Sequence, residues 1–153
     1  MTIGASADFE AFFAEAEPRL RRAFVAAFGG DVGRDAAAEA LAWAWEHWDR
    51  VVGFKNPSGY LYRVGRSRIR RRRQGLMFGA EPTGAPPRVE PALIPALLAL
   101  SERQRVVVVL VHGYGWSRRE VAELLDLTVS TVQTHLERAL ARLRAALEVT
   151  TDA

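Results

Sequence analysis

The feature that most constrains the fold is a run of prolines and glycines near the middle of the chain. Five of the seven prolines fall between residues 82 and 95, and three glycines occupy positions within 75–84. Proline lacks a backbone donor and glycine is costly to order, so this stretch favours neither helix nor strand. We predict a linker over residues 75–91 between two small domains, residues 1–74 and 92–148. A long loop inside one domain is the alternative, and such loops are uncommon in compact folds.

Composition limits what these two halves can be. The chain has 153 residues, of which 49% are hydrophobic, and it contains no cysteine, which excludes disulfides and thiolate metal sites. Its start has no basic segment followed by an apolar run, so we expect no signal peptide. The longest aliphatic run, Val106 to Val111, is far too short to cross a bilayer. We therefore expect a cytoplasmic protein that has no membrane partner and needs no cofactor.

The N-terminal half is predicted to be helical. Apolar residues recur at spacings of three and four from Phe9 to Phe28, where we expect Pro18 to separate or kink two helices. A third helix is predicted over about residues 32–48, with Trp45 and Trp48 on its buried face. A fourth is predicted from Asn56-Pro57, since asparagine caps helices and proline suits their first position.

The C-terminal half is predicted to be helical as well. The valine run Val106 to Val109 lies within a pattern that fits a buried helix better than an edge strand. With no alternating strand pattern of useful length elsewhere, we predict an all-α fold of two small helical domains.

Positive charge is concentrated in one short segment. Residues 51–75 carry one lysine and seven arginines with no acid, whereas residues 1–50 carry nine acids and five arginines. Such a basic stretch beside an acidic one indicates a polyanion on one surface and a different partner on another. Lys55 is the only lysine among 21 basic residues, and this arginine bias is also typical of a GC-rich genome.

Residues 117–144 carry the most specific pattern. Ser117 and Glu120 have the spacing of a capping box that opens a short helix. A turn follows, and Thr128 can cap a second helix, in which apolar residues from Val129 to Leu143 recur at spacings of three and four. Two helices joined in this way form a helix-turn-helix, whose second helix enters the DNA major groove. The alternative is an amphipathic helical hairpin with an ordinary polar face.

The polar residues of this segment have the chemistry of a DNA reader. The first two turns of the second helix contain short or flexible hydrogen-bonding side chains, which suit contacts with base edges. The first helix begins with arginines, which can bind phosphates. The residues expected to contact DNA here are Arg118, Arg119, Ser130, Thr131, Gln133, Thr134 and Arg138. Glu137 shares the same outward face.

The motifs Leu100–Val107, Gly115–Leu125 and Thr128–Leu143 together resemble region four of sigma factors of the extracytoplasmic-function class. The resemblance implies a domain that binds the minus-thirty-five promoter element and contacts the flap of RNA polymerase. Three residues depart from the family pattern: Asp126 replaces glycine, Gln133 replaces lysine, and Glu137 stands where histidine is common.

The segment Asp35–Trp45 is similar to the region-two helix that binds the polymerase clamp in the same family. The resemblance implies core RNA polymerase as a partner, with Asp35, Glu39 and Trp45 as contact residues. Ala38 replaces the usual glutamine. Without the resemblance, the two acids would be a solvated pair on a helix face and Trp45 a core residue. An anti-sigma factor is a frequent partner in the family and a candidate partner here.

The basic segment from Lys55 to Arg73 is similar to the strand-opening and minus-ten-reading part of the family. Melted DNA needs cations along its backbone and flat side chains against its bases. Here tyrosine and serine stand where the family has tryptophan and asparagine. The alternative for the arginine run is a solvated helix end that complements the helix dipole. The residues expected to contact promoter DNA are Lys55, Asn56, Tyr60, Tyr62, Arg63, Arg66, Ser67, Arg70 and Arg71.

These patterns predict a sigma factor, which binds RNA polymerase and directs promoter recognition, and they argue against an enzyme. His47, His112 and His135 lie on separate predicted helices, and no phosphate loop, metal cluster or nucleophile motif is present. The competing hypothesis is a helix-turn-helix regulator that binds DNA without joining polymerase. A sigma-like protein that has lost initiation activity is a third.

Overall fold

The computed structural model describes residues 3–75 and 92–151, and within these ranges every regular element is a helix. The all-α prediction is therefore confirmed. The chain forms two compact units, Met1–Glu81 and Pro82–Glu123 with Leu127–Ala153. Leu124 and Leu125 complete α7 and Asp126 stands in the turn after it, so we describe these residues together with α7. Most of the predicted linker, residues 76–91, lies outside the described residues, and its first residue, Gly75, ends a helix.

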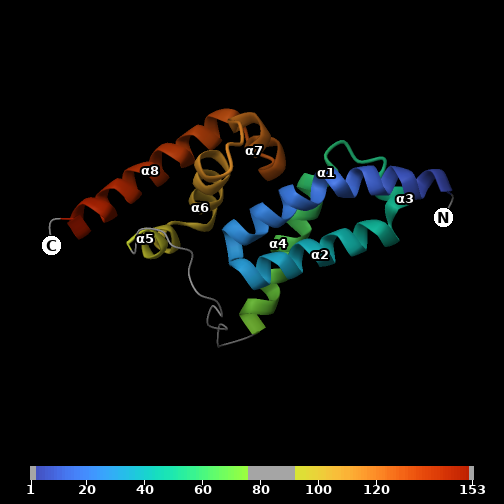
Figure 1. Ribbon diagram of the computed structural model, residues 1–153, viewed down its shortest axis with the longest axis horizontal. Helices are drawn as coiled ribbons and strands as arrows, with labels where there is room; N and C mark the ends of the chain where they lie inside the picture. The colour runs from blue at the N-terminus through green and yellow to red at the C-terminus, as the bar shows by residue number, and fades with distance from the viewer. Residues whose placement is uncertain (1–2, 76–91, 152–153) are drawn as a thin grey trace. The chain divides into compact units, whose positions relative to one another are not determined.

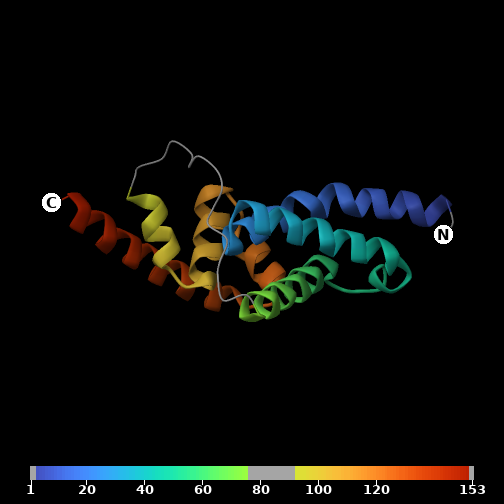
Figure 2. The ribbon, with the colours of Figure 1, turned by 90° about the horizontal axis from the view of Figure 1, so that it is seen from below.

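The first unit is built on two long helices, α1 (Ile3–Phe28) and α2 (Gly30–Glu46), which pack side by side (Figures 1 and 2). Gly29 joins them with a φ of 93°, a conformation that glycine adopts without strain. A short helix, α3 (Trp48–Val51), leads to α4 (Pro57–Gly75), which packs against both long helices. The buried side chains include Leu20, Phe24, Leu41 and Leu61.

Of three helix predictions in this unit, two need correction and one is confirmed. We expected Pro18 to separate or kink two helices; α1 continues through Pro18, so the separation is wrong. Burial of Leu20 and Phe24 just beyond Pro18 stabilises the helix against the lost hydrogen bond. The helix expected over residues 32–48 ends at Glu46, and α3 begins at Trp48. The start of α4 is as predicted, because the Asn56 side chain accepts a hydrogen bond from the Gly59 amide at 3.0 Å.

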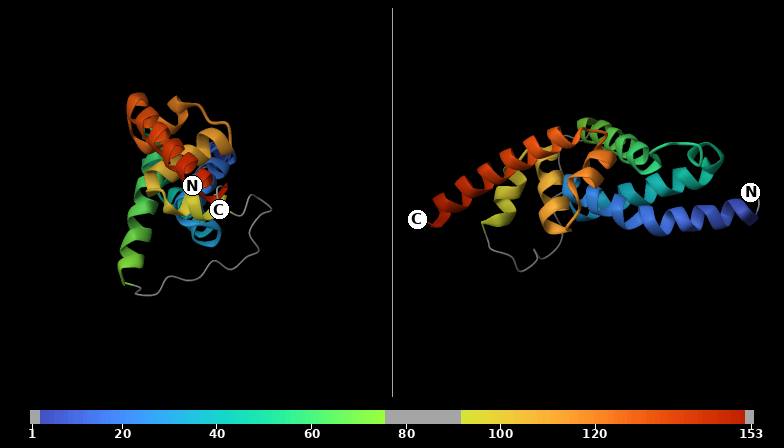
Figure 3. Two further views of the ribbon diagram at one scale, coloured as in Figure 1. Left: turned by 90° about the vertical axis from the view of Figure 1, so that its left-hand side faces the viewer. Right: turned by 90° about the horizontal axis from the view of Figure 1, so that it is seen from above.

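The second unit comprises α5 (Leu93–Ala99), α6 (Glu102–Val108), a π-helical turn η1 (Val109–Gly113), α7 (Arg118–Leu125) and α8 (Val129–Thr151). α5 and α6 both pack along α8 (Figure 3). Val106, Val107 and Val108 are buried, which confirms a buried helix for this part of the valine run, while the half-buried Val109 begins η1. Arg142 of α8 donates to Gln104 at 2.9 Å and to the Ala99 carbonyl at 3.0 Å, so one side chain holds the α5–α6 junction.

Candidate nucleic-acid interface

α7 and α8 form the predicted helix-turn-helix. Ser117 accepts from the Glu120 amide at 3.1 Å, and Glu120 accepts in return from the Ser117 amide at 3.3 Å, so the capping box is present. Asp126 in the turn has a φ of 56°, the left-handed conformation that aspartate tolerates better than most residues. Thr128 then caps α8 by accepting from the Thr131 amide at 3.1 Å. Sequence spacing alone predicted both caps and both helix starts.

The outward face of α8 is polar, as expected. Ser130, Thr134, Glu137 and Arg138 are exposed, while Thr131 and Gln133 are half-buried. Val129, which we expected on the buried face, is 45% exposed because it stands at the first position of the helix, beyond the core. The apolar face consists instead of Val132, Leu136, Ala139 and Leu143, all buried, with Leu140 half-buried.

Two of these outward side chains, Gln133 and Glu137, are joined to Arg118 in a hydrogen-bonded chain. Nε of Arg118 donates to Oε1 of Gln133, and Nε2 of Gln133 donates to Oε1 of Glu137 at 2.8 Å. Arg118 belongs to α7 and the other two residues belong to α8, so this chain ties the two helices together. The neighbouring Arg119 is exposed, as a phosphate contact requires. No local pattern indicated that Arg118 and Gln133 would meet, because they lie on different helices.

His135 lies nearly two turns into α8, on its half-buried side. Partial burial lowers the pKa of its imidazole, and the positive charges of Arg103 on α6 and Arg138 on α8 lower it further. The residue is therefore a neutral packing residue near neutral pH rather than an exposed cation.

α4 carries the basic segment of the first unit. Arg63, Arg70 and Arg71 are exposed, and Arg66 is half-buried. Arg71 donates to the Ser67 hydroxyl at 3.0 Å, so these two predicted DNA contacts form one polar group. Lys55 is exposed just before the helix, whereas Asn56 is engaged as its cap.

The two tyrosines at the start of α4 differ. Tyr62, which we expected to face DNA, is only 2% exposed, and its ring lies 4.9 Å from that of Phe24. In this position it belongs to the core and cannot stack on a base. Tyr60 is half-buried and lies 4.7 Å from the ring of Phe54 and 5.8 Å from that of Trp43.

Tyr60 thus belongs to an aromatic cluster that sequence reasoning missed. Its other members are Phe54, Trp43 and His47, whose ring stacks on Trp43 at 4.3 Å, with the Arg50 guanidinium 6.0 Å from the Trp43 ring centroid. The cluster is built from α2, α3, the loop before α4 and the first turn of α4, and of its members only Tyr60 was predicted to contact DNA. It provides flat side chains beside the cations of α4, the combination that single-stranded nucleic acid needs.

The acidic residues of α2 lie on its exposed side. Asp35 and Glu39 are both exposed, as expected for a partner contact. Glu39 accepts two hydrogen bonds from Arg72 of α4, each 3.0 Å long, which was not foreseen. The hydrogen bonds and the charge of Glu39 raise the pKa of Arg72. The predicted polymerase-contact residue is therefore paired with a member of the predicted DNA-contact segment.

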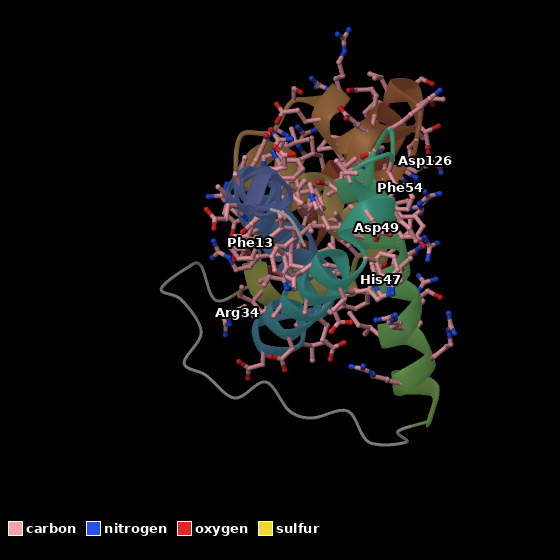
Figure 4. The ribbon with its side chains drawn as sticks, turned by 90° about the vertical axis from the view of Figure 1, so that its right-hand side faces the viewer. Phe13, Arg34, His47, Asp49, Phe54 and Asp126 are labelled. Atoms are coloured by element: carbon pink, nitrogen blue, oxygen red, sulfur yellow. The ribbon has the colours of Figure 1, made fainter. Side chains whose placement is uncertain are left out.

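Trp45 stands at the edge of an open groove of about 680 Å³ between α1 and α2. It is 39% exposed rather than buried, and its ring lies 4.9 Å from that of Phe9. Phe13, 44% exposed, lines the same groove with Ala38, and Arg34 stands at its edge. Figure 4 shows Phe13 and Arg34 on the side of α1 and α2, and His47 and Phe54 toward α4. The first unit thus has an apolar surface and a cationic one.

The described residues hold no group of histidine and acidic side chains that could bind a metal ion. Within the same residues, no helix is long and apolar enough to cross a membrane.

The sequence is similar to known proteins of one family. Residues 92–143 match the family model "Sigma-70, region 4". The RNA polymerase sigma-E factor of Streptomyces antibioticus is 32% identical over 126 residues, which cover 75% of this chain and 70% of that protein. The ECF RNA polymerase sigma factor SigL of Mycobacterium tuberculosis is 28% identical over 130 residues, covering 74% of this chain and 73% of that one.

A solved structure has the same fold. It is the sigma factor RpoE of Bartonella quintana, crystallised in complex with the anti-sigma factor NepR. The similarity covers 93% of this chain and 98% of that chain with a TM-score of 0.67, at 22% sequence identity.

Proposed function

The chain belongs to the RNA polymerase sigma factors of the extracytoplasmic-function class. On that premise we propose which of its surfaces bind promoter DNA and which bind RNA polymerase during transcription initiation. As a sigma factor it binds core RNA polymerase and directs it to promoters. It contributes recognition rather than catalysis, and it acts in the cytoplasm, where the polymerase and the chromosome are.

The observation that carries this proposal is the presence of two different nucleic-acid surfaces in one chain. One is a helix-turn-helix with its caps formed and a polar reading face on α8. The other is α4, whose arginines adjoin the Tyr60 aromatic cluster. A duplex reader explains the first surface only. Recognition of a duplex element together with melted DNA explains both.

We assign each surface to a promoter element. α8 reads the minus-thirty-five element as duplex, with Ser130, Thr131, Gln133, Thr134 and Arg138 near base edges and Arg119 on a phosphate. α4 and the Tyr60 cluster meet the minus-ten element, with exposed Arg63, Arg70 and Arg71 along the backbone. These assignments define residues 92–148 and 1–74 as the two functional domains, joined by the linker 75–91.

Core RNA polymerase docks on the side of α2. Asp35 and Glu39 supply exposed acids, and Trp45 and Phe13 border an apolar groove beside them. Apolar anchors surrounded by charged side chains are typical of protein interfaces. Ala38, where the family has glutamine, lines the groove and leaves it more apolar. We also propose an anti-sigma factor as a regulatory partner, since the structural neighbour was crystallised with one.

The experiment that tests this function is reconstitution with sigma-free core polymerase. The full chain should co-elute with core enzyme and give transcripts with defined start sites from upstream regions of its own genome. Asp35→Ala with Glu39→Ala should weaken co-elution, and Asp8→Ala with Glu15→Ala, which removes two exposed acids of α1, is the matched control. Specific duplex binding without any polymerase complex would instead support the helix-turn-helix regulator.

A further inference from the structure

The reading face of α8 carries a hydrogen-bonded chain that runs from Arg118 through Gln133 to Glu137. Arg118 and Glu137 are exposed and Gln133 is half-buried. Gln133 and Glu137 are four residues apart, so their side chains lie on one helix face, and Arg118 reaches that face from α7.

The chemistry of the two ends fixes how the Gln133 carboxamide is oriented. A guanidinium can only donate hydrogen bonds and a carboxylate can only accept them. The oxygen of the amide therefore has to face Arg118, and its nitrogen has to face Glu137, as observed. The reverse orientation would leave both bonds unmade.

This arrangement leaves defined groups for a base to contact. Oε1 of Glu137 accepts from Gln133, and Oε2 of Glu137 is left as an acceptor on the exposed face. In the major groove, cytosine offers an amino group, whereas guanine and thymine offer carbonyl oxygens to an approaching side chain. A carboxylate therefore attracts the cytosine edge and is repelled by guanine and thymine. Adenine is less favourable than cytosine, because its amino group lies beside the acceptor N7, which repels a carboxylate.

We propose that Glu137 is a specificity-determining residue that selects cytosine at one position of the duplex element, and that Arg118 is the positioning residue that holds it ready through Gln133. The proposal rests on the assignment of α8 as the duplex reader. It also removes Arg118 from the phosphate contacts, leaving Arg119 as the phosphate-binding arginine of α7.

Positioning by Arg118 has a distinct signature in binding measurements. An arginine on a phosphate raises affinity for every sequence, and its loss lowers the slope of log affinity against log salt by about one. An arginine that orients Gln133 changes the ratio between sequences and leaves that slope almost unchanged. Arg119→Ala is the matched comparison, since it removes the adjacent, exposed arginine of the same helix.

The test is selection of duplexes from a library randomised across the upstream element, carried out with the full chain alone and with the chain bound to core polymerase. Glu137→Gln should lose the cytosine preference at one position by about tenfold and gain adenine there, because glutamine pairs with adenine. Arg118→Ala should reduce the same preference, with an unchanged salt slope. Arg118→Lys keeps a donor for Gln133 and should restore part of it.

Each outcome decides the inference separately from the proposed function. A shifted base preference seen with the chain alone, but with no polymerase complex, would uphold the inference and overturn the sigma function. A polymerase complex whose selected sequence is the same for wild type and Glu137→Gln would overturn the inference and leave the function intact. No selected sequence in either format would overturn base reading by α8, and the inference with it.

Discussion

At the scale of single residues, the protonation state of His135 depends on burial and on neighbouring charges, which cannot be predicted from its place in the sequence. Its pKa is lowered by partial burial and by Arg103 and Arg138, so the folded chain takes up this proton at lower pH than the unfolded chain, whose histidine titrates near 6.5. As pH falls through about 6.5, the unfolded state binds more protons and stability declines; above that range the group contributes no pH dependence.

We therefore expect wild type to lose more stability than His135→Gln between about pH 7.5 and pH 5.5. Urea denaturation followed by circular dichroism at both values measures this, and the difference between the two proteins removes the contribution of other titrating groups. Equal losses in the two proteins would show that the environment of His135 does not disfavour its charged form.

Residues that act through the local backbone were predictable from sequence. Asn56, Ser117 and Thr128 cap helices as expected, because a cap depends on atoms no more than three residues away. Residues that act through tertiary contacts were not. Tyr62 is in the core because Phe24, far away in the chain, faces it, and no local pattern distinguishes it from Tyr60. The pairing of Glu39 with Arg72 depends likewise on how α2 and α4 pack.

At the scale of helices, Gly33 sets how closely α1 and α2 approach. A Cβ atom placed on Gly33 would lie 2.5 Å from the backbone of Val25 and 2.7 Å from the Phe24 carbonyl carbon. Backbone cannot move aside as a flexible side chain can, so the two helices would have to separate. Gly33 lies within α2, where glycine alone would be unfavourable, which indicates that packing rather than helix propensity requires it.

We expect Gly33→Ala to destabilise the first unit by about 1–3 kcal/mol, the usual cost of overpacking, despite the better helix propensity of alanine. Gly53→Ala is the control, since its Cβ would meet only the Arg50 carbonyl at 3.6 Å, an ordinary contact. Urea denaturation followed by tryptophan fluorescence suits the comparison because Trp43, Trp45 and Trp48 all report on this unit. A neutral Gly33→Ala would mean that α1 and α2 can separate freely.

The sequence predicted where helices begin better than it predicted where they are interrupted. Spacing and caps predicted where α4, α7 and α8 begin, since both signals are local. Pro18 was expected to separate or kink two helices, yet α1 continues through it, because burial on both sides of it outweighs one missing hydrogen bond. The π-helical turn after α6 had no local signal, and neither did the groove between α1 and α2, which depends on the packing of two helices.

At the scale of the whole molecule, the acidic residues of α2 and the basic residues of α4 meet in an ion pair. Arg72 pairs with Glu39, so a variant that removes the entire arginine run would also disturb a proposed polymerase contact. Arg70 and Arg71 can be replaced without touching this pair. Arg71 hydrogen-bonds to Ser67, which lies on the same helix, so its replacement breaks no contact between α4 and α2 that we describe.

Replacing Arg70 and Arg71 with alanine should therefore reduce promoter opening and its dependence on salt, while the affinity for core polymerase stays close to wild type. The physical reason is that two cations near the DNA backbone are lost, and each phosphate contact contributes about 0.7–0.9 to the slope of log affinity against log salt. Opening is measured by permanganate reactivity of melted thymines across a salt series, and polymerase affinity by titration with labelled core enzyme.

Arg72→Ala serves as the contrast: it releases Glu39 and should change polymerase affinity as well. If the Arg70–Arg71 variant lost polymerase binding instead of opening, the basic face of α4 would belong to the polymerase and not to DNA.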